Sequence, residues 1–287
     1  MARSTSTALP IKALRELATK LEASILECLA QPAKRSVHKL RTSTRRIEAQ
    51  LELLSMFPEL PAHDRPKQKL LRSLKKLRRA AGIVRDIDVQ RDLVAEVTPR
   101  KRRAQAASDL RNDALQLRQD LKRWREKHAE ELVELLKQEK VELPLAFKQL
   151  FDSLGDTDSF AISEADLASL ARTLYHQRTP VAVPDRDDIE HLHDIRKQAK
   201  LARYLAESAP ATAARAHRVA AQFENLQEAG GQWHDWLLLA EIARRELGDS
   251  AQLPKRFAAR AEKSLKQFER RIEKMNAHPP TSRPKAA

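Results

Sequence analysis

The chain has 287 residues and carries 54 Lys and Arg against 40 Asp and Glu, which gives a formal net charge of +14. An excess of positive charge on this scale points to a polyanionic partner, whether nucleic acid, an anionic membrane surface or polyphosphate. No apolar run approaches the ~18 residues of a membrane span, residues 1–10 lack the apolar segment of a signal peptide, and the single cysteine excludes an internal disulfide framework. We therefore expect a cytoplasmic protein that does not associate with membranes.

Sparse glycine and abundant Ala, Leu, Arg, Lys, Glu and Gln are typical of an all-helical protein. Apolar residues recur at helical spacing and predict helices, in chain order, over about residues 11–30, 33–57, 66–84 with a continuation to 97, 99–140, 163–175, 187–207, 212–246 and 254–275. The third helix is expected to bend or end near Gly82. Residues 142–159 hold Pro144, Gly155 and several aspartates, and indicate a boundary. The sequence thus predicts two helical halves over 10–142 and 160–275, followed by a disordered tail over 276–287.

Two segments of the first half recur in the second half. Residues 37–41 (VHKLR) resemble residues 192–196 (LHDIR), and residues 77–86 (LRRAAGIVRD) align with residues 226–235 (LQEAGGQWHD). The second alignment pairs Gly82 with Gly231, Arg85 with His234, and Asp86 with Asp235. Because both matches occur in the same order and at similar offsets, we interpret the halves as an internal duplication.

Each copy of the first motif carries cations along the border of its apolar face. In the first copy, Lys34, His38, Arg41 and Arg45 form a stripe beside apolar residues that recur at steps of three and four. In the second copy, the corresponding stripe is His193, Arg196, Lys200 and Arg203. Stacked like charges on one helix face repel each other, so this arrangement is expected where an anion binds.

The third predicted helix adds a further line of cations, Arg72, Lys76 and Arg79, next to its apolar face. Gly82 and its counterpart Gly231 are expected to allow a close helix approach, or a bend that aims Arg85 and His234 inward. Asp86 and Asp235 would then orient a basic group or interact with a helix end.

The paired motifs VHKLRTSTRR with LHDIRKQAK, and AGIVRDIDV with GGQWHDWLL, resemble the signatures of the CHAD family (conserved histidine α-helical domain). The similarity covers about residues 10–275, although Gln227 and Glu228 stand where the first half has Arg78 and Arg79. The resemblance implies two four-helix bundles related by a pseudo-twofold axis, with a basic central cavity that binds inorganic polyphosphate. It also implies an association with polyphosphate granules. We find no EXEXK stretch of the CYTH triphosphatase domain to which such domains are often fused.

The sequence therefore predicts an all-α protein that binds inorganic polyphosphate, is not an enzyme and uses no cofactor or metal. The candidate polyphosphate-binding residues are cations and histidines: Lys34, His38, Arg41, Arg45, Arg46, Arg72, Lys76, Arg79, Arg85, His193, Arg196, Lys197, Lys200, Arg203 and His234. Neighbouring arginines should keep the two repeated histidines neutral in the empty site, and bound phosphate should favour their charged form. We therefore expect binding to tighten as the pH falls towards 6.

Two alternatives remain at this point. A nucleic-acid-binding protein would use the same charge, because phosphate contacts dominate non-specific affinity, and weak nucleic-acid binding is expected in any case. Only 4% of the residues are aromatic, and Trp124, Trp233 and Trp236 are interpreted as packing residues instead of base-stacking platforms. A metal-dependent phosphohydrolase could use His234 and Asp235, but the equivalent pair in the first half begins with an arginine, which is no metal ligand. Among the other basic residues, Arg118, Lys122 and Arg125 of the long helix are further candidates for the cavity, and His176 is expected to be a surface residue.

Overall fold

The computed structural model describes residues 7–98, 105–180 and 182–277. Within these residues the chain is almost entirely helical, which confirms the all-α prediction. The elements are β1 (Thr7–Ala8), α1 (Pro10–Ala30), α2 (Lys34–Leu54), α3 (Asp64–Val97), α4 (Gln105–Leu154), β2 (Ile162–Ser163), α5 (Glu164–Arg178), α6 (Ile189–Glu207), α7 (Ala214–Leu247) and α8 (Gln252–Asn276). The helix start predicted at Pro99 lies outside the described residues, as does the predicted tail from residue 278 onward.

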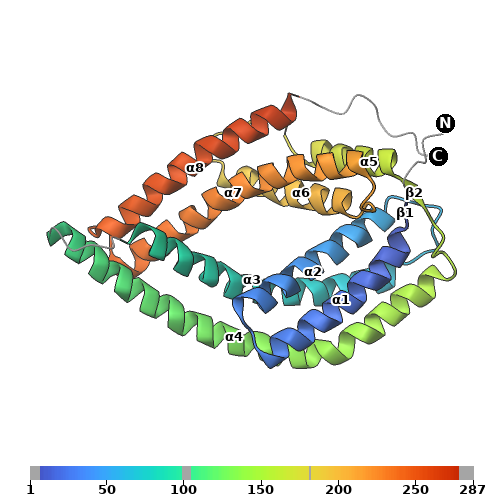
Figure 1. Ribbon diagram of the computed structural model, residues 1–287, viewed down its shortest axis with the longest axis horizontal. Helices are drawn as coiled ribbons and strands as arrows, with labels where there is room; N and C mark the ends of the chain where they lie inside the picture. Colours follow the sequence, from blue (N-terminus) through green and yellow to red (C-terminus); the bar gives the residue numbers. More distant parts are fainter. Residues whose placement is uncertain (1–6, 99–104, 181, 278–287) are drawn as a thin grey trace.

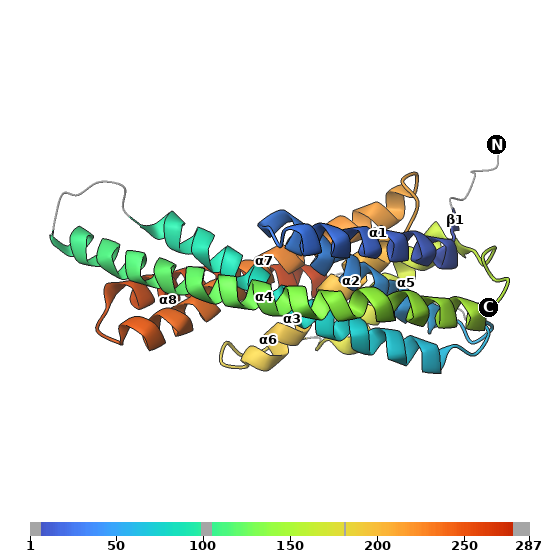
Figure 2. The same cartoon turned by 90° about the horizontal axis from the view of Figure 1, so that it is seen from below.

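Consecutive helices pack against each other within each group of four, α1 to α4 and α5 to α8. Figure 1 shows α4 along one edge of the molecule and α8 along the opposite edge, with α2, α3, α6 and α7 between them. Seen from below in Figure 2, the long helices follow the length of the molecule. Between the groups, α2 contacts α6, α3 contacts α7 and α4 contacts α8. Contacts between counterparts are what a pseudo-twofold axis would produce, and the duplication itself stays a prediction.

Three apolar clusters hold the helices together. The first lies mainly within α5 to α8, the second within α1 to α4, and the third joins α3 and α4 to α7 and α8. Trp233 belongs to the first cluster and Trp236 to the third, and both are at least 95% buried, as predicted for packing residues. Because α7 packs into two clusters, apolar contacts before and after residues 227–235 hold this segment of the helix in place.

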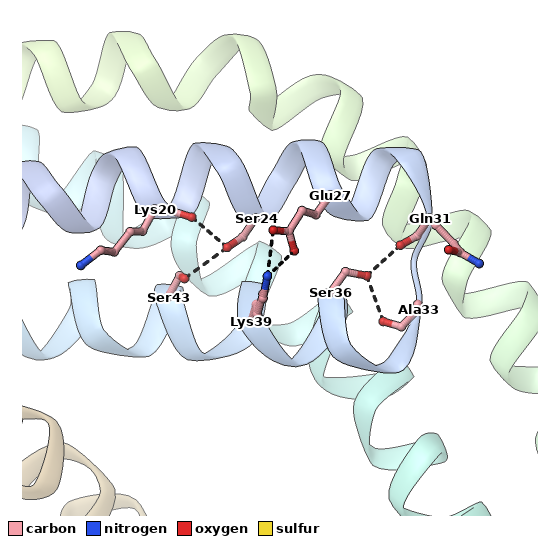
Figure 3. Close-up of polar contacts among 8 residues, drawn as sticks. All are labelled: Lys20, Ser24, Glu27, Gln31, Ala33, Ser36, Lys39 and Ser43. Carbon is pink, nitrogen blue, oxygen red and sulfur yellow. Dashed lines mark hydrogen bonds and ion pairs between the residues drawn. The ribbon is translucent and has the colours of Figure 1, made fainter.

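The α1–α2 hairpin orients the first basic stripe (Figure 3). Lys39 donates hydrogen bonds to both carboxylate oxygens of Glu27, at 2.8 and 2.9 Å, and Ser24 lies 3.4 Å from Ser43. At the connection between the helices, Ser36 donates to the carbonyl oxygen of Gln31 at 2.7 Å. These contacts fix one side of α2 against α1, and the helical period then places residues 38, 41 and 45 on another side.

The long helix α4 does not end near residue 140, so the helix end predicted there was wrong. It continues to Leu154 with Pro144 inside it. Leu143, Phe147 and Leu150 are buried in the first-half core, and burying each such side chain contributes about 1.5–3 kcal/mol. Together these contributions exceed the roughly 3 kcal/mol that an internal proline costs a helix. In the same way, α3 runs through Gly82 and does not end there.

The β1 strand pairs antiparallel with β2, opposing Thr7 to Ser163 and Ala8 to Ile162. This short pairing ties the beginning of the described chain to the start of α5. Along the described helices, none combines the length and apolar character that crossing a membrane would require.

Candidate functional site

A pocket of about 550 Å³ lies between α2, α3, α6 and α7, and we call it the interhelical pocket. It brings together seven of the predicted site residues: His38, Arg41, Arg45, Arg85, Arg196, Lys200 and His234. Asp86 and Asp235, the aspartates paired by the internal alignment, also line it. Positions 155 residues apart in the chain, such as 41 and 196, therefore share one site, as the repeat predicts.

The lining cations of α2 and α6 border buried apolar residues. In α2, Val37 and Leu40 are fully buried, and Arg41 follows them on the side that faces the pocket. In α6, Leu192, Ile195 and Ala199 are fully buried in the same way beside the stripe that contains Arg196. Packing of the apolar side thus fixes the direction in which each basic stripe points.

Glycines let the two central arginines lie close to neighbouring helices. A Cβ atom at Gly82 would lie only 3.0 Å from Nη1 of Arg41, so the guanidinium rests directly against the α3 backbone. In the second half, the close contact falls on Gly230, where a Cβ atom would lie 3.2 Å from Cγ of Arg196. A close helix approach at Gly231, one of the two roles predicted for it, is not found, because a Cβ atom there would meet nothing within 4 Å. Gly231 instead lines the pocket.

Three lining groups carry buried polar atoms that have no hydrogen-bond partner in the described part of the chain: Nη1 of Arg85, Nε of Arg196 and Nδ1 of His234. Buried donors are nearly always satisfied in folded proteins, and leaving one unpaired costs about 1–3 kcal/mol, or more when it is charged. Two unpaired guanidinium donors in a single pocket indicate a place for a ligand that supplies acceptors.

The cations of the pocket disfavour each other. Burial, followed by the charges of Arg196, Arg45 and Arg41, holds the pKa of Lys200 well below its usual value. Burial and then Arg41 lower the pKa of Arg45 to about 10. For His38, burial and then Arg85 and Arg41 lower the pKa. Each of these groups would gain from a bound anion, which offsets the mutual repulsion and favours the charged forms.

His193 and His234, both in the second half, lie next to each other at the wall of the pocket. Their ring centroids lie 4.6 Å apart in an edge-to-face arrangement. Burial, and then the charge of Arg196, lowers the pKa of His193 to about 4 and that of His234 to about 3. Both imidazoles are therefore neutral in the empty pocket near pH 7, as the sequence predicted for His193.

Three carboxylates of the described chain, those of Asp86, Glu228 and Asp235, line the pocket and partly balance its positive charge. Asp86 forms an ion pair with Arg41 across 3.8 Å. Burial raises the pKa of Asp235 to about 6, and the charge of Asp86 acts in the same direction, while Arg196 opposes it. The carboxylate of Asp235 thus titrates closer to neutral pH than an exposed aspartate does.

The other predicted residues do not line the interhelical pocket. Five of them bind acids elsewhere: Lys34 pairs with Asp92, Arg46 with Glu207 at 3.3 Å, Lys76 with Glu139 at 3.8 Å, Lys197 with Asp194 at 2.5 Å, and Arg203 with Glu207 at 2.6 Å. Arg72 and Arg79 are exposed on α3 away from the lining, and His193 reaches the site only through His234. Arg118 and Lys122 are exposed and do not line the pocket either.

Arg125 has a structural role. Its Nε donates to Asp88 at 3.2 Å, and its Nη2 donates to the carbonyl oxygen of Pro32 at 2.5 Å. Both side chains of this ion pair are largely buried. Arg125 therefore ties α4 to α3 and to the α1–α2 connection.

Sequence reasoning missed several lining residues, among them Tyr204 and Thr42. Tyr204 could have been predicted from the helical period, because it lies four residues after Lys200 on the same helix face. The predicted stripe instead continued to Arg203, three residues after Lys200. Arg78 does not line the pocket, but its charge interacts with those of two arginines that do, and it was not predicted. It forms an ion pair with Glu48, and burial together with Arg45 and Arg41 lowers its pKa to about 10. In the internal repeat Arg78 aligns with the neutral Gln227, so the comparison of the two halves did not indicate it as a site residue.

In the described residues, no group of three or more His, Cys, Asp or Glu side chains is arranged to hold a metal ion. The lining is instead rich in guanidinium groups, which bind phosphate and carboxylate oxygens in pairs. The fold and the pocket thus define an all-helical protein with a cationic pocket between its helices.

The family model of the CHAD domain matches residues 12–244, and the chain belongs to this family. Its fold is similar to the crystal structure of the CHAD domain from the plant Ricinus communis, with a TM-score of 0.60 at 19% identity, covering 96% of this chain and 92% of that one. It is also similar to PptA from Streptomyces chartreusis, with a TM-score of 0.59 at 13% identity, covering 96% of this chain and 99% of that one. A search of curated proteins found no relative of this sequence.

Proposed function

We propose that this protein binds inorganic polyphosphate in the interhelical pocket and that it acts as a binding protein, not as an enzyme. The observation that carries the proposal is the convergence of Arg41, Arg45, Arg85, Arg196 and Lys200 from three helices, α2, α3 and α6, on one pocket, with guanidinium donors left unpaired. CHAD domains are associated with polyphosphate binding in general, which supports the same ligand.

Polyphosphate suits this lining because it presents a negative charge on every repeat unit and no bases to be read. Arginine can contact two phosphate oxygens at once, and Lys200 can follow the chain as a mobile charge. The pocket volume of about 550 Å³ falls in the range of about 300–1,000 Å³ usual for small-ligand sites. Tyr204 is the single Tyr, Phe or Trp among its lining residues in the described chain, so it offers little surface for stacking bases.

With this function, the protein would be located in the cytoplasm, on polyphosphate granules. A protein of this kind would hold the polymer without altering it. Two of its three carboxylates support that reading, because Asp86 is already paired with Arg41 and Asp235 lies among cations. With these two engaged, the described lining leaves no pair of carboxylates to hold the metal ions that phosphoryl transfer normally uses.

The test is calorimetric titration with long-chain polyphosphate at ~0.15 M salt, where exposed charges beyond about 8 Å are screened. The double variant Arg41→Ala, Arg196→Ala should bind at least about 100-fold more weakly, because each charged hydrogen bond contributes about 1.5–3 kcal/mol. The matched control is Arg72→Ala, Arg79→Ala, which removes the same charge from α3 outside the pocket and should bind almost normally.

Duplex DNA at the same phosphate concentration serves as the competitor. The proposal requires that DNA displaces polyphosphate poorly, because a duplex cannot enter the pocket. Equal competition by DNA, or an equal loss of affinity in the two double variants, would indicate a generic cationic surface. Either result would favour the alternative of a nucleic-acid-binding protein.

A further inference from the structure

We propose that a polyphosphate chain longer than the interhelical pocket leaves it across α7 and continues over a second cationic site on α5, α7 and α8. This outer basic surface consists of Arg172, His176, Arg270, Arg271 and Lys274. The proposal rests on the function proposed above, and it adds a binding site that serves long chains only.

Shared lining residues connect the interhelical pocket with the outer surface. Glu228 and Gln232 of α7 line the interhelical pocket and also a second pocket of about 530 Å³ between α7 and α8. That second pocket shares Asn225, Arg271 and Lys274 with a third pocket of about 340 Å³. The three pockets therefore adjoin one another across α7, and a flexible polymer can pass from one to the next.

Three arginines of the outer surface, Arg172, Arg270 and Arg271, are not held by a carboxylate of the described chain. Within the described residues, no ion pair involves Arg270 or Arg271, and Arg172 donates to the neutral amide oxygen of Gln222 at 2.9 Å. Two other bases of α8 are engaged, since Lys266 pairs with Glu262 at 3.1 Å and Arg260 pairs with Glu96 at 3.7 Å. Arg270 and Arg271 both line the second pocket.

The charge balance along this route favours an anion. Among the described residues that line the second and third pockets, Glu228 is the only acid. His176 also lines the third pocket, and burial followed by the charge of Arg172 lowers its pKa. A phosphate chain beside Arg172 would favour the protonated imidazole and gain a further donor.

The opposite exit from the interhelical pocket is less suitable. It passes Tyr204 into a groove beside α1, where Arg46 already pairs with Glu207. The same groove carries Lys12 and Lys20 together with a second acid, Glu16. Two carboxylates therefore offset the cations on that side, and an anion at Arg46 would have to displace one of them, whereas Arg270 and Arg271 pair with none in the described chain.

The experiment compares two probes, tripolyphosphate and long-chain polyphosphate, on the full chain and on the double variant Arg270→Ala, Arg271→Ala. The variant should bind the long chain about 3- to 30-fold more weakly, as expected for two exposed ion contacts. The slope of log affinity against log salt should become shallower by about 1.4, at ~0.7 for each lost phosphate contact. Tripolyphosphate should bind the variant within about twofold of the wild type, because neither arginine lines the interhelical pocket.

The matched control is Lys255→Ala, Arg256→Ala, which removes two exposed bases from α8 outside all three pockets. The proposal is overturned if Arg270→Ala, Arg271→Ala binds the long chain as the control does, or if it loses affinity for both probes equally. It is also overturned if the variant loses duplex DNA binding but keeps long-chain binding. Absence of polyphosphate binding in the wild type would instead overturn the function on which the proposal rests.

Discussion

The imidazole of His193 lies edge to face against that of His234, with 4.6 Å between the ring centroids. The first ring comes from the basic stripe of α6, and the second comes from α7 beside Asp235. Both rings are neutral in the empty site because burial and Arg196 depress their pKa values to about 4 and about 3. Keeping these two histidines unprotonated in mild acid therefore lowers the free energy of unfolding.

This depression predicts acid sensitivity. An unfolded histidine titrates near 6.5, so the unfolded chain binds more protons than the folded chain as the pH falls from 6.5 towards 4 and 3. Stability that is fully present above pH 6.5 is lost in that window, by on the order of 1–3 kcal/mol at pH 5 once the partial exposure of His193 is allowed for. Thermal unfolding at pH 7.5 and pH 5 measures the loss. His193→Gln, His234→Gln should lose clearly less, and an unchanged loss would argue against this origin.

Binding should respond to pH in the opposite direction. A bound phosphate chain favours the protonated histidines and protonated Lys200, so the complex takes up protons as it forms. Affinity for polyphosphate should therefore rise several-fold from pH 8 to pH 6 at fixed salt. Titration in buffers of different ionisation enthalpy would count the protons taken up. A proton count of zero, with equal affinity at both pH values, is the result that this account does not allow.

Asp235→Asn should strengthen binding at pH 8, where the wild-type carboxylate is ionised beside the ligand. The pKa of about 6 predicts that the difference between variant and wild type shrinks as the pH falls below 6, because Asp235 then loses its charge. We expect a gain of roughly 3- to 10-fold at pH 8, equivalent to about 1 kcal/mol. If the variant binds more weakly at pH 8, Asp235 instead holds a neighbouring arginine in its binding position.

Gly82→Ala should separate stability from binding. Alanine favours a helix over glycine by about 1 kcal/mol, but its Cβ would lie 3.0 Å from the Arg41 guanidinium and push that group aside. The variant should keep or gain stability and bind polyphosphate several-fold more weakly. Gly231→Ala is the control, because its Cβ meets nothing within 4 Å, and it should gain stability with little change in affinity. Equal affinities of the two variants would mean that the position of Arg41 is unimportant.

Arg125→Leu should affect folding and leave the site intact. Removing one member of a buried ion pair leaves Asp88 without its partner, which typically costs 3–5 kcal/mol. Chemical denaturation should show this loss, while the fraction that remains folded binds polyphosphate with normal affinity. A stable variant with weaker binding would place Arg125 in the site after all.

The fold was largely predictable because apolar residues at steps of three and four persist through nearly every helix. The exception near Pro144 shows the limit of local reasoning. Proline chemistry predicts a break there, whereas Leu143, Phe147 and Leu150 continue the buried face of α4 against helices that lie far away in the sequence. The cost of the proline is local, and the gain that outweighs it depends on the assembled core.

The site was predictable where the repeat gave two independent views of it. The α2 and α6 stripes were found because cations occupy matched places beside matched apolar faces, and Arg41 and Arg196 meet in one pocket. On α3 the sequence offered several basic lines, and only the position of α7 decides that Arg85 lines the pocket and Arg79 does not. The acids that engage Arg46 and Lys76, at positions 207 and 139, are likewise brought there by tertiary packing alone.

The lining of the interhelical pocket extends along the chain from His38 to Asp235. At a synthesis rate of about 5–20 residues per second, the ribosome needs roughly 10–40 s to make the residues between these two positions. For that time the arginines of α2 have emerged without the helices that later enclose them, next to ribosomal RNA, itself a polyanion. Contacts between α1 and α2, such as Lys39 with Glu27, are available from the beginning and leave Arg41 and Arg45 uncovered. On the proposed function, the folded protein would distinguish polyphosphate from RNA because its helices enclose the pocket, whereas the partly synthesised chain would attract either polyanion through charge alone.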